Sequence, residues 1–299
     1  MISKKIKNKT VGILMAGGFG TRLYPTTKVL NKHLINIYDK PMIYYSLSIL
    51  MLAKINEIAI VSSKKDVEIF KKLFENSKDL GLKLKFIVQK KPKGIAEGIL
   101  LSKKFIANRN IMLVLGDNLI YGNSLTSNLI SAKNQLTEHT AQIFGCFSNN
   151  PNMFGVIQFD KKNQIRKIIE KPKKFISNYA VPGIYFYGNN VLKHITKLKY
   201  SNRGELEITD LNNIYISNKL MKVSIFGRGI NWLDTGTPEG LLEASNFVSA
   251  VQKSSGNKIA CIEEIALNNK WISNKYLKKL IDNIYKNSFY KNYIGKLVE

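Results

Sequence analysis

The first strongly apolar segment of the chain is Val11-Gly12-Ile13-Leu14-Met15-Ala16, and the glycine-rich stretch Gly17-Gly18-Phe19-Gly20-Thr21-Arg22 follows it directly. A short, continuous apolar run that ends in glycines is typical of a strand buried on both faces of a sheet. Glycines let the backbone approach a ligand and point N–H groups at it, and threonine and arginine side chains add donors suited to phosphate oxygens. The segment therefore predicts a buried strand followed by a phosphate-binding loop.

The loop matches neither of the two common nucleotide-binding fingerprints. The Walker A spacing GxxxxGK[ST] is absent, and the dinucleotide pattern fails because Leu23 stands where the last glycine is required. Taken alone, the loop is equally compatible with a plain glycine-rich turn between a strand and a helix.

Strands and helices alternate through the first half of the chain, with strands expected at 58–62, 84–88 and 111–115 and helices at 42–53, 66–76 and 95–105. This alternation predicts an α/β fold, in which a Rossmann-like, mainly parallel but mixed sheet is flanked by helices. Further strands are expected at 141–146, 155–159, 164–169, 180–187 and 221–226, with a helix at 207–218. We expect a basic extension over residues 1–10, one α/β domain over 11–238, and a C-terminal helical region over 239–299 packed on it.

The composition is strongly basic, with 46 Lys and Arg against 21 Asp and Glu and a net charge of +25. Such a charge attracts polyanions, so nucleic acid has to be considered as a partner. The lysines are scattered along the chain, however, and no basic tail or arginine-rich stripe is present. We therefore interpret the charge as a compositional bias on an ordinary enzyme and expect no nucleic-acid partner.

The two cysteines, Cys146 and Cys261, lie far apart and form no CxxC motif, which indicates buried thiols in a reducing compartment. The histidines His33, His139 and His194 share no metal-ligand spacing. The longest apolar run, around residues 42–53, is too short and too polar to span a bilayer. We expect a cytoplasmic protein that has no membrane partner.

Polar residues at the ends of apolar runs are the candidates for chemistry. Asp117 follows the strand expected at 111–115, where open α/β sheets bind ligands, and aspartate is a hard ligand suited to Mg²⁺. Asp234 in Asn231–Thr237 could join it around one metal ion. Glu170 and Lys171 could contact a sugar and its phosphate. Each also has an ordinary interpretation, as a cap or as a solvated surface charge, and so has Lys32.

These segments occur in one order, and in that order the chain resembles the glucose-1-phosphate thymidylyltransferase family of sugar nucleotidyltransferases, which make dTDP-glucose and pyrophosphate from dTTP and glucose 1-phosphate. The resemblance runs from about Val11 to the C-terminal helices. Its most specific parts are Leu14–Pro25, Ile37–Tyr45, Leu115–Asn118, Arg203–Asp210 and Trp232–Thr237.

The resemblance implies a role for each matching position. The residues implied to bind the nucleotide are Leu14, Gly17, Gly18, Gly20, Thr21, Arg22, Gln89, Gly94 and Asp117, with Gln89 and Gly94 reading the thymine edge. The residues implied to bind the sugar phosphate are Gly155, Glu170, Lys171, Val181, Arg203 and Trp232. Asp117 and Asp234 would hold Mg²⁺, and Arg22, Lys32, Asp117 and Asp234 would form the catalytic set.

The resemblance also implies in-line attack of the sugar phosphate at the α-phosphorus. No protein nucleophile is needed, and the cations serve to offset the repulsion between two anions. The family is typically a homotetramer with a regulatory nucleotide site at subunit contacts, and its product usually leads to dTDP-L-rhamnose for surface polysaccharides.

Several positions depart from the family pattern. They are Phe19, where a small residue is common, His33 and Glu97, where Gln is usual, Asn36 for Pro, Phe154 for Tyr, and Pro182 for Thr. Phe154 and Pro182 remove polar groups near the sugar. A uridylyl- or adenylyltransferase, a nucleotide-binding regulator that has lost activity, and a basic nucleic-acid-binding protein remain as alternatives.

Overall fold

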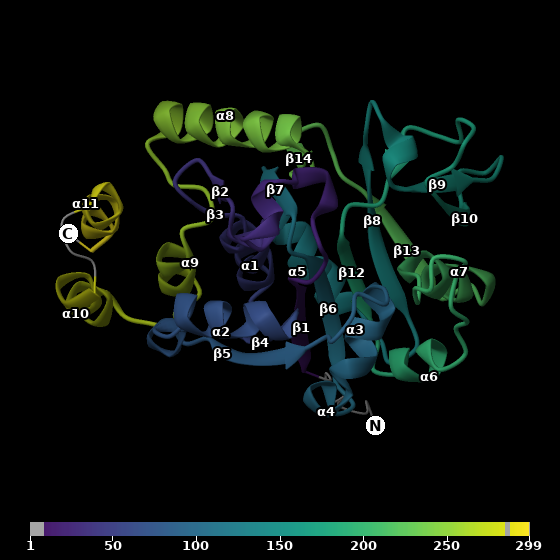
Figure 1. Cartoon of the computed structure of the whole chain (residues 1–299), viewed down its shortest axis with the longest axis horizontal. Helices are drawn as coiled ribbons and strands as arrows, with labels where there is room; N and C mark the ends of the chain where they lie inside the picture. Colours follow the sequence, from purple (N-terminus) through teal and green to yellow (C-terminus); the bar gives the residue numbers. More distant parts are fainter. Residues whose placement is uncertain (1–8, 285–287, 299) are drawn as a thin grey trace, which may run out of the picture.

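The computed structural model describes residues 9–284 and 288–298, so most of the basic extension expected at residues 1–10 lies outside the described residues. Within that part, ten strands form one mixed sheet in the order β10-β9-β11-β8-β12-β6-β1-β4-β5, with β13 paired to β8 (Figure 1). β1 (Thr10–Met15) lies between β6 (Asn110–Leu115) and β4 (Glu57–Ser62), parallel to both. The apolar run that opens the chain is therefore a central strand, as predicted.

The parallel half of the sheet follows from the alternation of strands and helices. β5 (Lys83–Val88) continues the sheet beyond β4 in parallel. The connecting helices are α1 (Met42–Leu52), α2 (Lys64–Leu73), α3 (Ile95–Leu101) and α4 (Lys103–Ile106). α1 begins directly after the short hairpin of β2 (Asn36–Ile37) and β3 (Lys40–Pro41).

The second half adds antiparallel strands to the same sheet. β12 (Ile184–Tyr187) pairs antiparallel with β6 and with β8 (Ala141–Phe147), and β13 (Met221–Ile225) pairs parallel with β8. β9 (Gly155–Phe159), β10 (Ile165–Glu170) and β11 (Tyr179–Ala180) extend the far edge. The helices of this half are α5 (Leu125–Gln135), α6 (Val191–Ile195) and α7 (Ile208–Ser217).

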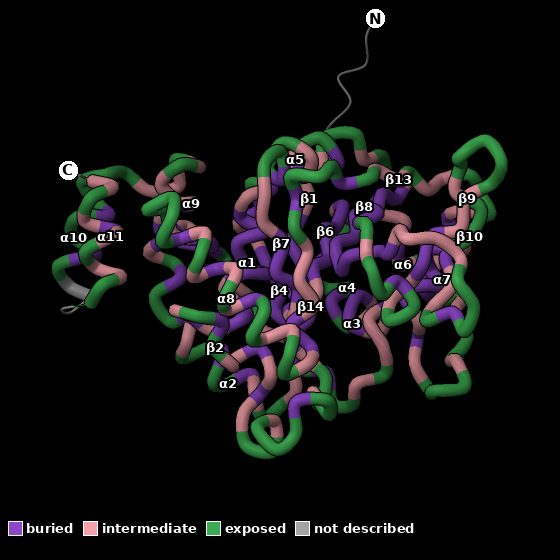
Figure 2. The backbone as a smooth tube through the Cα atoms, turned by 90° about the horizontal axis from the view of Figure 1, so that it is seen from above, coloured by how far each residue is buried: buried purple, intermediate pink, exposed green. Residues whose placement is uncertain are grey.

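Alternate residues of the central strands build two cores on opposite faces of the sheet. Leu14 joins the core formed with α1, α2, α5 and α9 (Ile262–Asn268), whereas Ile13 and Met15 join the core formed with α3, α4, α6 and α7. Burial on both faces explains why the strand reads as a continuous apolar run. Figure 2 shows the buried backbone concentrated along these central strands.

The first C-terminal helix covers a second, smaller sheet. In it β14 (Ile230–Asp234) pairs antiparallel with β7 (Asn118–Gly122), and α8 (Pro238–Ser255) packs on β14 and β2. α10 (Asn274–Ile284) and α11 (Phe289–Lys296) share a small apolar cluster at one end of the molecule, opposite β9 and β10 (Figure 1). None of the helices described here is long and apolar enough to cross a membrane.

The structure divides two of the expected elements, and it adds β7, α5, α6 and β14, which were not predicted. The helix expected at 95–105 is divided into α3 and α4 at the buried Ser102, whose Oγ donates to the Gly98 carbonyl at 2.7 Å. The strand expected at 180–187 is interrupted between β11 and β12, at residues 181–183, where Pro182 lacks the N–H that a central strand needs.

Candidate active site

The glycine-rich loop leaves the carboxyl end of β1 in a conformation that requires glycine. Gly18 and Gly20 have φ values of 103° and 59°, in the left-handed region. A Cβ on Gly20 would lie 2.9 Å from Thr27 Cγ2 and 3.1 Å from Lys32 Cβ, so a side chain at this position would displace the lysine. The loop therefore passes closely over Lys32, which places the two predicted phosphate-binding elements side by side.

Lys32 and Asp117 form an ion pair at the centre of the site. Lys32 begins a short 3-10 turn (Lys32–Leu34), and the Asn31 side chain caps it by accepting the His33 N–H at 2.9 Å. Asp117 follows the end of β6 after one residue, Gly116. Burial raises the pKa of Asp117, but the charges of Lys32 and its hydrogen bond outweigh burial and lower it to about 2. The structure thus joins two predicted residues that are 85 positions apart.

Asp234 lies beside Asp117 because β14 pairs with β7. Asp234 is in register with Asn118, and Thr235 Oγ1 donates to the Asp117 carbonyl at 2.7 Å. Burial and then the charge of Asp117 raise the pKa of Asp234, while Arg22, whose Nη1 lies 3.8 Å from Asp234 Oδ2, lowers it. Two predicted carboxylates and two predicted cations thus converge at one point.

Two adjacent carboxylates of this kind fit a magnesium ion. Both are half-buried oxygen ligands, and burial followed by the Asp117 charge raises the pKa of Asp234. A cation between the two carboxylates would therefore offset their repulsion. Among the described residues no cluster of three or more His, Cys, Asp or Glu could hold a metal. A two-carboxylate site leaves positions for phosphate oxygens and water, which is how Mg²⁺ is usually held with nucleotides.

Gln89 and Gly94 lie on the other side of the loop. Gln89 lines both a cavity of about 350 Å³ and one of about 200 Å³, together with Gly17 and Gly18; the smaller cavity also contains Lys32 and Asp117. Gly94 has a φ of 100°, and a Cβ there would lie 2.3 Å from the Leu206 carbonyl oxygen. Leu14, by contrast, has its side chain in the hydrophobic core, so it acts through the strand that carries the loop.

Four of the six predicted sugar-phosphate residues lie together at the β9–β10 edge. Gly155 and Glu170 are cross-strand partners, and the Val181 N–H donates to the Gly155 carbonyl at 2.9 Å. Glu170 Oε2 accepts from Thr209 Oγ1 at 2.7 Å. Lys171 follows with its side chain exposed and a φ of 43°, which turns the chain out of the strand.

The other two sugar-phosphate residues differ in their surroundings. Trp232 Nε1 donates to Asn118 Oδ1 at 2.7 Å, and its ring lies 4.5 Å from that of Phe154, measured between centroids. Both aromatic residues line a cavity of about 810 Å³ that also reaches Arg22 and Asp234. Arg203 is exposed, and its Nη2 donates to Glu207 Oε1 and Oε2 at 3.0 and 2.9 Å. Its guanidinium is therefore paired with a carboxylate of the protein.

Several polar residues that support the site could not be recognised from the sequence. Asn118, Thr209 and Thr235 each make a hydrogen bond to a predicted site residue across 39 or more positions. All three fall inside quoted motifs, Leu115–Asn118, Arg203–Asp210 and Trp232–Thr237, which is the one signal that the sequence offers for them. The His33 ring packs against Gly116, where a Cβ would lie 2.5 Å from His33 Cδ2. Burial, followed by the charge of Lys32, lowers the pKa of His33 to about 3. This departure from the family pattern therefore introduces a neutral ring and adds no charge beside Lys32.

Comparisons with known proteins agree with this arrangement. The model of the nucleotidyl transferase family matches residues 11–251. The chain is 44% identical to the glucose-1-phosphate thymidylyltransferase of Neisseria meningitidis, over 96% of this chain and 99% of that protein, and 39% identical to that of Mycolicibacterium smegmatis, over 96% and 99%.

Among solved structures, a proposed glucose-1-phosphate thymidylyltransferase from Bacillus anthracis is similar, with a TM-score of 0.73 at 35% identity, over 80% of this chain and 95% of that chain. The central strands, the glycine loop and both aspartates lie inside the region that the family model matches. The chain therefore belongs to the nucleotidyl transferase family and, within it, to the glucose-1-phosphate thymidylyltransferases.

Proposed function

We propose that the protein catalyses the transfer of a thymidylyl group from dTTP to glucose 1-phosphate, forming dTDP-glucose and releasing pyrophosphate. The observation that carries the proposal is the convergence of Lys32, Arg22, Asp117 and Asp234 beside the glycine loop. A cavity that contains Gln89 lies on one side of this group, and a cavity lined by Trp232 lies on the other.

The reaction joins two anions, so its main obstacle is electrostatic. A phosphate oxygen of glucose 1-phosphate attacks the α-phosphorus of dTTP, and the bond from that phosphorus to the pyrophosphate oxygen breaks on the opposite side. The attacking phosphate is already anionic, so no general base is required. Lys32 and Arg22 reduce the repulsion and hold the two substrates in line.

The ion pairs of the free protein suggest how the site accepts its substrates. Lys32 and Arg22 each face a carboxylate, and Arg22 at 3.8 Å from Asp234 is only loosely held, with half of its side chain exposed. An incoming triphosphate offers both cations a more highly charged partner. We infer that they exchange the aspartates for phosphate oxygens, which leaves Asp117 and Asp234 available for a metal.

Mg²⁺ bound by Asp117 and Asp234 would neutralise part of the triphosphate charge and so favour the departure of pyrophosphate. Asp117 and Asp234 become available to a metal only when Lys32 and Arg22 leave them to bind the triphosphate. We therefore infer that metal and nucleotide bind together. On the sugar side, Glu170 accepts hydrogen bonds from hydroxyls, and Lys171 pairs with the phosphate of glucose 1-phosphate. Gly155, the cross-strand partner of Glu170, and Val181, which is hydrogen-bonded to Gly155, lie beside them.

The direct test is to incubate the protein with glucose 1-phosphate, Mg²⁺ and, in turn, dTTP, UTP, ATP and CTP, and to measure pyrophosphate. Rapid release with dTTP supports the proposal. Formation of UDP-glucose without dTDP-glucose would instead identify a uridylyltransferase, and binding of nucleotide without any pyrophosphate would identify an inactive regulator.

The family resemblance also carries proposals on assembly and setting. We propose a homotetramer, which light scattering of the purified protein tests directly. We further propose one α/β domain over residues 11–238 with the C-terminal helical region packed on it, a cytoplasmic location where nucleoside triphosphates are made, and a product used for dTDP-rhamnose and polysaccharide synthesis.

A further inference from the structure

The Gln89 carboxamide is buried at the edge of the two cavities that flank the glycine loop. The residue is 6% exposed, and its main-chain N–H donates to the Ser62 carbonyl at 2.8 Å, which fixes the point from which the side chain extends. An amide has a donor end and an acceptor end, so its rotation decides which of the two a ligand meets.

Two acceptors fix this rotation. Gln89 Nε2 donates to Glu97 Oε2 at 2.7 Å and to the Gly94 carbonyl at 3.2 Å. Neither a carboxylate nor a carbonyl can donate, so turning the amide over would place its oxygen against two other oxygens. Both Nε2 hydrogens are therefore used inside the protein.

The amide oxygen is left to face the cavity. Gln89 Oε1 lies 3.2 Å from the position that a Cβ on Gly17 would take, and both residues line the cavity that contains Lys32 and Asp117. A ligand whose phosphates meet Lys32 thus meets a hydrogen-bond acceptor at the Gln89 end of the same cavity.

We propose that Glu97 is a positioning residue for base recognition: it holds Gln89 so that Oε1 accepts the ring N–H of an imide base. Thymine and uracil carry that donor at N3, whereas cytosine has an acceptor at N3 that Oε1 repels. The proposal rests on the proposed function, because it assumes that the nucleoside enters at Gln89. Glu97 itself contacts Gln89 and not the substrate.

The residue type at position 97 matters because a carboxylate can only accept hydrogen bonds. A glutamine at that position could accept from Gln89 but could equally donate to it, so it would fix the rotation less firmly. A carboxylate removes the second possibility. Glu97 also lies in the first turn of α3, where the helix dipole favours a negative charge.

The test compares Glu97→Ala, Glu97→Gln and the wild type, with Glu68→Gln as a control at an exposed carboxylate on α2 that is paired only with Lys71. kcat and KM are measured for dTTP, dCTP and N3-methyl-dTTP, each with glucose 1-phosphate. For Glu97→Ala we expect kcat/KM for dTTP to fall about tenfold, the size of a lost charge-assisted hydrogen bond. The KM for glucose 1-phosphate stays within about twofold, because a single hydrogen bond at the base end is removed.

A merely structural role would not change the choice of base. We expect the preference for dTTP over dCTP, and over N3-methyl-dTTP, to fall about tenfold in Glu97→Ala, because the freed amide can present either end. Glu97→Gln should recover most of the dTTP activity but only part of the preference. Unchanged preferences in Glu97→Ala, or an equal loss for both substrates, would overturn the proposal.

Equilibrium binding separates this proposal from the proposed function. Calorimetry with dTTP and with dCTP, without glucose 1-phosphate, measures base preference without turnover. If the wild type releases no pyrophosphate yet binds dTTP more tightly than dCTP, and Glu97→Ala loses that preference, the proposed function fails and the role of Glu97 stands. A wild type that binds both nucleotides equally would contradict the role of Glu97 even if turnover were normal.

Discussion

Two clusters of lysines and aspartates in this molecule look alike in composition but differ in what surrounds them. At the active site, Lys32 pairs with Asp117, and their side chains are 15% and 20% exposed. At the C-terminal end, Lys258 pairs with Asp39 at 2.6 Å, and their side chains are 15% and 18% exposed. The degree of burial therefore does not distinguish an ion pair in a candidate active site from one that only stabilises the fold.

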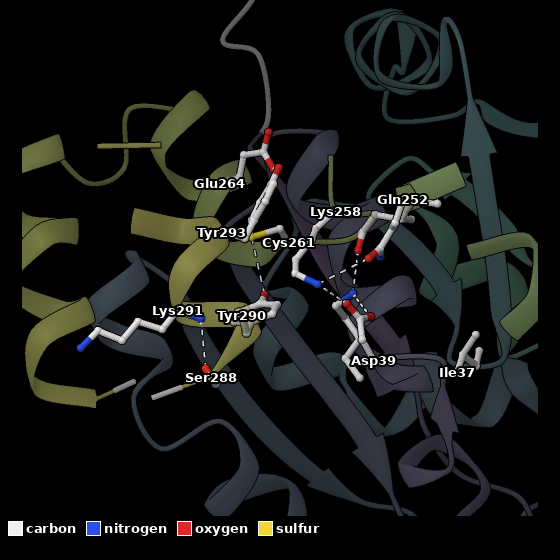
Figure 3. Close-up of polar contacts among 12 residues, drawn as sticks. Ile37, Asp39, Gln252, Lys258, Cys261, Glu264, Ser288, Tyr290, Lys291 and Tyr293 are labelled. Atoms are coloured by element: carbon white, nitrogen blue, oxygen red, sulfur yellow. Dashed lines mark hydrogen bonds and ion pairs between the residues drawn. The ribbon is translucent and has the colours of Figure 1, made fainter. Parts of the chain in front are cut away.

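The surroundings of the charges do distinguish them. Asp39 also receives Lys40 Nζ at 2.5 Å, and Lys40 donates in addition to the Ile259 carbonyl at 2.9 Å. The excess positive charge is covered by aromatic rings, with Lys258 5.4 Å from the Tyr290 centroid and Lys40 5.1 Å from that of Tyr45. Figure 3 shows Lys258 reaching Asp39 between the C-terminal helices and the β2–β3 hairpin.

The active-site pair opens instead onto a cavity of about 200 Å³. The neighbouring carboxylate, Asp234, is only weakly paired, because Arg22 Nη1 lies 3.8 Å from its Oδ2. The charges of the Asp39 cluster are thus neutralised within the protein. The charges around Asp117 and Asp234 are only partly paired and face a cavity. Substitutions at matched positions should separate the two.

The largest expected effect is on catalysis, in Asp117→Asn. Loss of this carboxylate removes a proposed metal ligand, and we expect kcat/KM to fall about 10³-fold, as for other groups that stabilise transition-state charge. Pyrophosphate release with dTTP, glucose 1-phosphate and Mg²⁺ measures the loss. Activity equal to that of the wild type would refute the metal assignment.

Asp39→Asn should have the opposite profile. Removing one partner of a buried ion pair leaves Lys40 and Lys258 uncompensated, so the free energy of unfolding should drop by about 3 kcal/mol. Denaturant unfolding measures the change, and kcat and KM should stay within about twofold because the cluster touches no substrate. Glu68→Gln, at an exposed pair, is the control and should change stability by less than about 0.5 kcal/mol. A drop in activity at full stability would show that the comparison is wrong.

Lys32→Met tests whether the active-site pair is held for the ligand. We expect kcat/KM to fall about 100-fold through lost phosphate contacts. Mn²⁺ without nucleotide should bind the variant more tightly than the wild type, because Asp117 is no longer paired; water-proton relaxation detects this binding. Weaker Mn²⁺ binding would argue against the exchange of partners.

The smallest expected effect is the pH dependence of stability. Burial raises the pKa of Asp39, but hydrogen bonds and charges from Lys258 and Lys40 outweigh burial and hold it below the ordinary value of 3.8. A lowered carboxyl pKa adds stability that is complete above the unfolded value and is lost as pH falls through the folded value. The melting temperatures of wild type and Asp39→Asn should therefore converge as pH drops below 3.8, and a gap that widened there would contradict this sign.

Much of the central fold could be predicted because single strands carry their own signal. β1 reads as a buried strand since its residues pack on both faces of the sheet, and α7 falls within one residue of the helix expected at 207–218. The division of α3 from α4 falls at the buried Ser102 and has no periodic signature.

The candidate site could be predicted from the sequence only in part, because many of its contacts join residues that are far apart in the chain. The glycine loop and Asp117 are marked by local pattern, but the contact of Asp234 with Asp117 arises from the pairing of β14 with β7, across more than a hundred residues. The ion pair of Arg203 with Glu207 and the hydrogen bond of Glu97 to Gln89 depend on side-chain geometry. The sequence predicts that Asp234 could join Asp117, but no property of the individual residues indicates the contacts of Arg203 with Glu207 and of Glu97 with Gln89.

Gly94 links the two ends of the site. The Leu206 N–H donates to the Lys93 carbonyl at 2.8 Å, the Ala96 N–H donates to the Leu206 carbonyl at 3.3 Å, and a Cβ on Gly94 would collide with that carbonyl oxygen. Residues 93–97, which include the partners of Gln89, are therefore hydrogen-bonded to Leu206, in the segment that carries Arg203 and Glu207. If positions 89–97 read the base and Arg203 the sugar phosphate, as we propose, substitutions in one segment should also shift the other, so libraries aimed at new sugar nucleotides should vary both segments together.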